Sequence, residues 1–99
     1  MATPLSIATD RRDDGTVVVT ATGEIDMSNV DSFAGALSTV KTDGEATTVD
    51  LSGVEYLDSG AINVLFAHAE GMRLIANPIL LPVLTISGLA DVATVERAD

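Results

Sequence analysis

Apolar and polar positions recur with two different periods along this chain, and the periods predict its secondary structure. Alternating or β-branched runs predict strands, whereas apolar residues spaced three and four apart predict amphipathic helices. The strands are predicted over residues 5–9, 16–22, 46–51, 72–76 and, unless this end is a frayed tail, 92–96. Helices are predicted over residues 29–41 and 60–70, with a third that begins at Pro78 or at Leu81–Pro82 and ends near Gly88.

Small and polar residues mark the ends of these elements. Gly23 is expected to end the second strand, and Ser52-Gly53 to break the chain after the third. Ser28 lies three residues before Asp31, a spacing that resembles a capping box with Asp in place of Glu, so Ser28 is expected to begin the first helix. Gly71 is expected to end the second helix.

The order of the predicted elements is β-β-α-β-α-β-α, with a further strand in one reading. A polar turn at residues 10–15 predicts a hairpin, and the later β-α-β connections predict parallel neighbours. We therefore predict one α/β domain over residues 1–99, with a mixed sheet of four to five strands flanked by three to four helices. Because only 3% of the residues are aromatic, its core must be aliphatic.

The charge balance narrows the classes of partner. Five basic residues against fifteen acidic residues give a net charge of −10, which argues against binding to nucleic acid or to an anionic membrane and favours a basic protein surface. The chain has no cysteine. Its first residues lack the pattern of a signal peptide, and its longest apolar run, Ile79–Ile86, is too short to cross a bilayer. A cytoplasmic protein is expected.

Asp58 and Ser59 lie between the third strand and the second helix. Either side chain can cap that helix, which leaves a hydroxyl at or near a helix N-terminus, where backbone N–H groups favour negative charge. Ser59 is therefore a candidate to carry a phosphate, and the alternative is a purely structural capping serine.

Catalytic and cofactor sites find little support in the sequence. Ser59 and the single histidine, His68, would lie roughly 13 Å apart along one helix, too far for a catalytic pair. Asp26 and Asp58 each follow a strand and could meet at one end of the sheet, where a carboxylate pair could hold Mg²⁺. No glycine-rich nucleotide-binding motif occurs. We predict no enzyme activity, no metal and no cofactor.

A possible contact surface lies at the start of the third helix. Ile79, Leu80 and Leu81 are consecutive and apolar, and a helix packed on a sheet hides one face, so at least one of them should face outward. The alternative is a buried tight turn. The later apolar residues of this helix are expected to be buried: Val83, Leu84 and Ile86.

Four segments together resemble a known family. These are Thr22–Asp26 after the second strand, Val49–Ser59 with its central Leu-Asp-Ser, Asn77–Pro78, and Gly88–Leu89. The pattern is similar to that of a STAS domain of the anti-sigma factor antagonist type, and it covers nearly the whole chain.

This resemblance implies a function. Members of the family bind an anti-sigma factor that is also an ATP-dependent serine kinase of the GHKL type, and this binding releases a sigma factor for transcription. The kinase phosphorylates the serine after the Asp, here Ser59, which ends the interaction, and a phosphatase restores it. Asp26 and Asp58 match family positions beside that serine.

The sequence departs from the family just after the serine. The family usually has Asp-Ser-Ser-Gly-Leu-Gly, whereas this chain has Gly60, Ala61 and Asn63 where the second serine and the two glycines stand. Gly60 should loosen the start of the helix, and Ala61 and Asn63 should add side chains on the partner-facing surface. The alternative function is a STAS interaction module that is not phosphorylated and acts as a scaffold or homodimer through residues 79–86.

Overall fold

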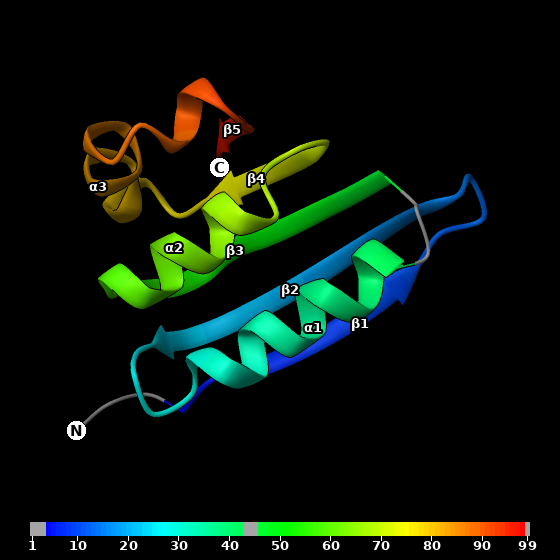
Figure 1. Ribbon diagram of the computed structural model, residues 1–99, viewed down its shortest axis with the longest axis horizontal. Helices are drawn as coiled ribbons and strands as arrows, with labels where there is room; N and C mark the ends of the chain where they lie inside the picture. The colour runs from blue at the N-terminus through cyan, green and yellow to red at the C-terminus, as the bar shows by residue number, and fades with distance from the viewer. Residues whose placement is uncertain (1–3, 43–45, 99) are drawn as a thin grey trace.

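The computed structural model describes residues 4–42 and 46–98, and it folds into a five-stranded sheet with helices packed against it (Figure 1). The elements in chain order are β1 (Ser6–Arg11), β2 (Thr16–Ile25), α1 (Val30–Thr42), β3 (Ala46–Leu57), α2 (Ser59–Ala67), β4 (Met72–Ala76), the 3₁₀ turn η1 (Pro78–Leu80), α3 (Leu81–Ile86), the 3₁₀ turn η2 (Leu89–Asp91) and β5 (Thr94–Arg97). The predicted α/β fold and the last strand are confirmed.

The strands lie in the sheet in the same order as in the chain. β1 pairs antiparallel with β2 through a hairpin, and each later neighbour pairs parallel. A parallel connection must cross over the sheet, and α1 and α2 fill two of these crossovers. Because the parallel strands point the same way, the segments that follow Ile25, Leu57 and Ala76 gather at one end of the sheet.

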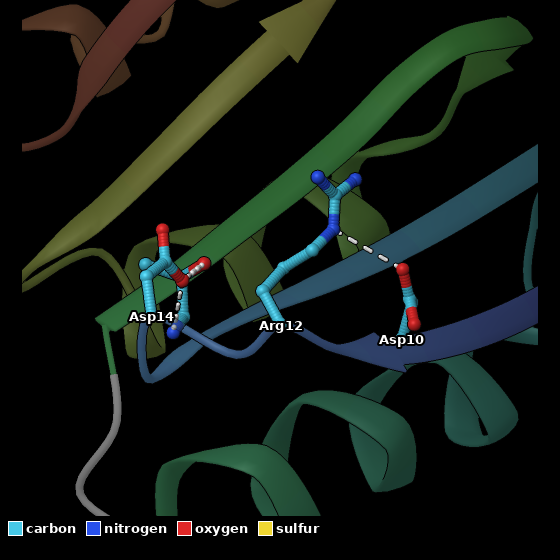
Figure 2. A network of polar contacts seen from close by, with 4 residues as sticks. Asp10, Arg12 and Asp14 are labelled. Carbon is cyan, nitrogen blue, oxygen red and sulfur yellow. Dashed lines mark hydrogen bonds and ion pairs between the residues drawn. The ribbon is translucent and has the colours of Figure 1, made fainter.

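The β1–β2 hairpin closes the opposite end of the sheet through local polar contacts (Figure 2). Asp14 Oδ1 accepts hydrogen bonds from the Thr16 hydroxyl at 2.6 Å and the Thr16 N–H at 3.0 Å. These two bonds hold the pKa of Asp14 below its ordinary value, and the bond from the Thr16 hydroxyl has the larger effect. Arg12 Nε donates to Asp10 at 3.1 Å, and Gly15 supplies the positive φ of 89° that the turn requires.

β2 and β3 are longer than their sequence patterns predicted. β2 passes through Gly23 to Ile25, and β3 passes through Ser52-Gly53 to Leu57, so both predicted ends were wrong. The register shows why: between the pairs Thr20–Asp50 and Thr22–Gly53, β3 contains one more residue than β2. Such a bulge interrupts the side-chain alternation without ending the strand, and it makes a continuous strand look broken in the sequence.

The core lies between one face of the sheet and helices α1 and α2, which both cover that face in Figure 1. Alternate residues of β2, such as Val17 and Val19, are fully buried beneath the helices, whereas Val18 is partly exposed on the other face. Phe33 of α1 and Leu65 of α2 are also fully buried. The core is thus aliphatic apart from one phenylalanine, as the composition predicted.

The segment after β4 shows where the third helix begins. Asn77 caps the η1 turn by accepting a hydrogen bond from Ile79 N–H at 3.1 Å, and α3 then begins at Leu81 with Pro82 in its first turn. Proline is tolerated there because first-turn N–H groups have no intrahelical acceptor. The later of the two predicted starts is therefore confirmed.

Helix α2 ends earlier than predicted. Its last residue is Ala67, and Gly71, expected to end it, lies in the following turn with a φ of 74°. No helix in the described part of the chain is long and apolar enough to cross a membrane.

Candidate functional site

Asp58, and not Ser59, caps helix α2. The Asp58 backbone is extended, with φ −88° and ψ 179°, and its Oδ1 accepts a hydrogen bond from Ala61 N–H at 2.9 Å. The Asp58 carbonyl accepts a second bond, from Ile62 N–H at 3.1 Å. The sequence left two candidates for the cap, and the structure assigns it to the carboxylate.

Ser59 is consequently the first residue of α2, and it is exposed. Over residues 4–42 and 46–98, no hydrogen bond engages the Ser59 hydroxyl. The N–H groups of a first helical turn lack intrahelical acceptors, and the helix dipole places a partial positive charge there. A solvent-exposed hydroxyl in this position is accessible to a modifying enzyme, and an anion attached to it would be stabilised.

Asp26 and Asp58 follow neighbouring strands at the same end of the sheet. Ile25 pairs with Leu57, and Asp58 N–H donates to the Ile25 carbonyl at 3.2 Å. Asp26 and Asp58 therefore directly follow the paired residues Ile25 and Leu57. The expectation that both follow strands ending at the same end of the sheet is confirmed.

The loop after β2 is held by its own polar side chains. Asp26 Oδ1 accepts from the Ser28 hydroxyl at 2.5 Å and from Ser28 N–H at 2.8 Å. Asn29 Oδ1 accepts from Asp26 N–H, and Asn29 Nδ2 donates to the Glu24 carbonyl, both at 2.9 Å. The two bonds from Ser28 lower the pKa of Asp26, and the bond from the hydroxyl has the larger effect. This carboxylate is therefore negatively charged at neutral pH.

This loop corrects the predicted start of helix α1. The Ser28 hydroxyl and the Ser28 N–H both donate to Asp26 Oδ1, whereas in a capping box the N–H would donate to the Asp31 carboxylate. The helix begins at Val30, and Ser32 N–H donates to the Asn29 carbonyl. Ser28 is therefore a loop residue whose two hydrogen bonds to Asp26 stabilise the turn after β2.

The three residues after Ser59 lie in different environments. Asn63 is exposed and Gly60 is partly buried, with an ideal Cβ at Gly60 only 3.3 Å from Asp58 Oδ1. Ala61 is fully buried, so the expectation that its side chain faces a partner was wrong. Its methyl group is part of the core. Two positions along a helix is a little more than half a turn, so Ala61 lies on the side of α2 opposite the exposed Ser59.

His68 lies at the other end of α2. Its Nδ1 lies 2.9 Å from the Val64 carbonyl and its Nε2 lies 3.3 Å from the Ser38 hydroxyl, which links the end of α2 to α1. The partly exposed histidine thus has the boundary position expected from the sequence. Across the described ranges, no group of three or more His, Cys, Asp or Glu residues is placed to hold a metal ion.

The predicted contact surface at residues 79–81 is only partly exposed. Ile79 is 65% exposed, whereas Leu80 is 3% exposed and Leu81 packs partly buried against the core. Ile79 confirms that at least one of the three faces outward, whereas Leu80 lies in the core and was wrongly included in the candidate contact surface. Among the residues expected to be buried, Leu84 is buried, but Val83 and Ile86 are exposed by 37% and 86%. The expectation failed because it buried every apolar residue of a short helix, whereas only one side of α3 packs against the core.

Comparison with known proteins shows which domain family and which fold the chain matches. A family model described as "Mlab, STAS domain" matches residues 8–96. No curated protein sequence matches the chain significantly. The structure is similar to an anti-sigma factor antagonist from Mycobacterium paratuberculosis, with a TM-score of 0.85 and 26% identity over 94% of this chain and 86% of that chain.

Two further similar structures are those of SpoIIAA. The anti-sigma factor antagonist SpoIIAA in its unphosphorylated form has a TM-score of 0.73 at 20% identity, over 95% of this chain and 89% of that chain. The Bacillus protein in its phosphorylated form has a TM-score of 0.68 at 20% identity, over 95% and 92%. At this identity the likeness concerns the fold. The match over residues 8–96 and the shared fold together show that this chain belongs to the STAS-domain family.

Proposed function

We propose that this protein is an anti-sigma factor antagonist that binds a GHKL-type anti-sigma factor kinase and is switched off by phosphorylation of Ser59. The observation that carries the proposal is the Ser59 hydroxyl in the first turn of α2, which is exposed and makes no hydrogen bond with any described residue, because Asp58 provides the cap. Through this role the protein regulates sigma-factor-dependent transcription in the cytoplasm.

The comparisons support the general role. The similar protein from Mycobacterium paratuberculosis is an anti-sigma factor antagonist, and it is alike over 94% of this chain. The fold is similar to SpoIIAA in both its unphosphorylated and its phosphorylated form. A fold found in both states suits a switch that changes the surface and keeps the interior.

The proposed reaction requires one nucleophile from this chain, the Ser59 hydroxyl. The Ser59 oxygen attacks the terminal phosphorus of ATP, a new O–P bond forms, the bond to the leaving ADP breaks, and the hydroxyl proton passes to a base of the kinase. The chain supplies an accessible nucleophile and the first-turn N–H groups of α2, which would stabilise the product phosphate. A phosphatase then hydrolyses the phosphoserine and restores the hydroxyl.

The phosphate would change the interface through charge and bulk. It adds about −1.5 to −2 charges beside Asp58 and the ionised Asp26, in a chain whose net charge is already −10. An interface that fits a small neutral hydroxyl would then contain added negative charge, and such a mismatch costs several kcal/mol. Since about 1.4 kcal/mol changes affinity tenfold, this cost would dissociate a complex of micromolar affinity.

Phosphorylation by the cognate kinase tests the site. Wild type, Ser59→Ala and Ser32→Ala are incubated with the kinase and Mg-ATP, and the phosphate is located by mass spectrometry. Ser32 is a matched control because it is also exposed in the first turn of a helix. We expect wild type and Ser32→Ala to take up one phosphate and Ser59→Ala none. Equal uptake by Ser59→Ala and wild type would refute the assignment.

Binding measurements test the electrostatic argument. Ser59→Glu should weaken binding to the anti-sigma factor at least tenfold, whereas Ser59→Gln, of similar size but neutral, should weaken it less. Titration calorimetry at two salt concentrations separates charge from bulk, because salt screens only the charge. Equal affinities for the Glu and Gln variants would show that bulk alone operates the switch. Binding without any phosphate uptake would instead support the non-phosphorylated interaction module.

A further inference from the structure

Strand β1 forms one edge of the sheet, next to helix α1 (Figure 1). It pairs with β2 on one side, and across the described ranges no strand pairs with its other side. Ile7 is partly buried, and the other residues of the strand are exposed. The outer side of β1 is therefore accessible to the backbone of another extended chain.

The hairpin bonds show which backbone groups of β1 face outward. Arg12 N–H donates to the Thr16 carbonyl at 2.8 Å, so the backbone of Arg12 faces β2. In an antiparallel pair this direction alternates from one residue to the next. Counting back along the pairing of β1 with β2, Ala8 also faces β2, whereas Ile7 and Thr9 direct their N–H and C=O groups to the outer edge.

The two edges of the sheet differ in how well they are protected. Natural edge strands avoid unwanted pairing through short length, charged side chains, proline or bulges. β5, at the other edge, has only four residues, and two of them, Glu96 and Arg97, are charged. The Ser6–Thr9 part of β1 contains no charged residue and no proline, and it pairs with β2 without a register shift. β1 is therefore the edge that can accept a strand.

An open groove of about 470 Å³ lies beside this edge, between β1 and the start of α1. Its lining residues are Pro4, Leu5, Ile7, Ser28, Asn29 and Ser32. Leu5 and Ile7 pack partly buried against the core, so they give the groove an apolar floor. Because the side chains of a strand alternate between its two faces, every second side chain of an added strand would point to the groove side.

We propose that the outer edge of β1 binds an extended segment of a partner protein, which pairs with the backbone of Ile7 and Thr9 and places an aliphatic side chain in the groove. The edge requires an extended backbone, because only such a chain can pair with N–H and C=O groups at every second residue. The net charge of −10 favours a segment whose remaining side chains are basic. Those side chains would lie on the other face of the sheet, as the exposed Asp10 does.

The same charge disfavours pairing of β1 with a second copy of this chain, because two chains of charge −10 repel one another. The proposal goes beyond the function proposed for Ser59 and does not require that serine or its phosphorylation. A binding experiment without any kinase therefore tests it separately.

Peptide selection on the full chain provides the first test. Random peptides displayed on phage are selected on wild type, and those that also bind Thr9→Pro are removed. Proline at this position deletes an outward N–H but no bond to β2, so the variant should keep its fold, which circular dichroism checks. Thr9→Val is the matched control, because it changes the same side chain and keeps the N–H. We expect alternating aliphatic and basic peptides, bound at least tenfold more weakly by Thr9→Pro and within about twofold by Thr9→Val.

Two N-methylated analogues of the selected peptide separate backbone pairing from charge, and they need no variant of the protein. One has methyl groups on every second amide and the other on the remaining amides, so both keep the same side chains and the same charge. Only one set of amides faces β1 in an extended segment. One analogue should therefore lose at least tenfold in affinity while the other binds like the parent peptide, and equal affinities would overturn the proposal.

Amide exchange of the isotope-labelled full chain, followed by nuclear magnetic resonance, locates the bound peptide. Exchange at Ile7 and Thr9 should slow on binding, and exchange at Ala8 should change less, because its N–H already faces β2. Ser32→Phe, which fills the groove, should weaken binding at least tenfold, whereas Thr39→Phe, exposed further along α1, should not. Selection of no peptide, or protection elsewhere in the chain, would overturn the proposal. Concentration-dependent shifts of Ile7 and Thr9 without peptide would instead assign the edge to a second copy.

Discussion

Asp58 caps α2 and also lies beside Ser59, so its two roles must be separated by substitution. Asp58→Ala removes the oxygen that accepts the Ala61 N–H at 2.9 Å. Because Ala61 is fully buried, water cannot replace that oxygen without a local rearrangement. Losing a helix N-cap costs about 0.5–2 kcal/mol, and leaving a buried donor unsatisfied costs about 1–3 kcal/mol. We expect a loss of about 1–2 kcal/mol in the free energy of unfolding.

A domain of this size should unfold in one cooperative transition, so the loss can be measured directly. Each kcal/mol lowers the melting temperature of a 60–100-residue domain by roughly 4–8 °C, which predicts a decrease of roughly 4–16 °C for Asp58→Ala. Urea denaturation followed by circular dichroism gives the free energy, and a thermal scan gives the melting temperature.

Two controls distinguish the hydrogen bond from charge. Asp58→Asn keeps an oxygen for the Ala61 N–H and loses only the charge, whose interaction with the helix dipole is worth about 0.3–1 kcal/mol. Ser59→Ala removes an exposed hydroxyl that has no hydrogen bond within the described part of the chain, and it should change stability by less than about 0.5 kcal/mol. If Asp58→Asn is as destabilised as Asp58→Ala, or if neither is destabilised, the capping argument is wrong.

Two further predictions concern the sheet and the response to acid. Gly53→Ala should destabilise the fold by about 1–3 kcal/mol, because the new Cβ would lie 2.7 Å from Thr22 Cγ2. Adding Thr22→Ala to the same chain should restore most of the lost stability. If the effects of the two substitutions are additive in this double-mutant cycle, the predicted clash is wrong. The pKa values of Asp14, Asp26 and Glu96 are lowered in the folded protein by hydrogen bonds, for Glu96 from Arg73. These contacts stabilise the fold fully above the ordinary carboxyl pKa of about 4, and the stabilisation is lost as the pH falls through the lower folded values. Urea midpoints from pH 7 to pH 2.5 in 1 M salt, which screens the net charge, should decrease below about pH 4; a constant midpoint would count against the contribution of these bonds.

Most of the architecture follows from local patterns in the sequence. The aliphatic runs predicted the strands, the three-and-four spacing predicted α1 and α2, and the polar turn predicted the hairpin. The position of Asp58 and Ser59 between a strand and a helix was also readable, because capping uses short-range contacts. The break expected at Ser52-Gly53 was wrong because a bulge lies there, and a bulge depends on pairing with the neighbouring strand.

The sequence by itself therefore determined the elements, their order and the place of the candidate serine. Only the tertiary structure decided which oxygen caps α2 and that the Ser28 hydroxyl donates to Asp26. It also decided that Ala61 and Leu80 are buried while Ile86 is exposed. The physical reason is that periodicity shows which side chains share a face, whereas the packing of each helix on the sheet decides which face is covered. In α3 the apolar residues extend beyond the buried side, and the sequence could not show which of them remain at the surface.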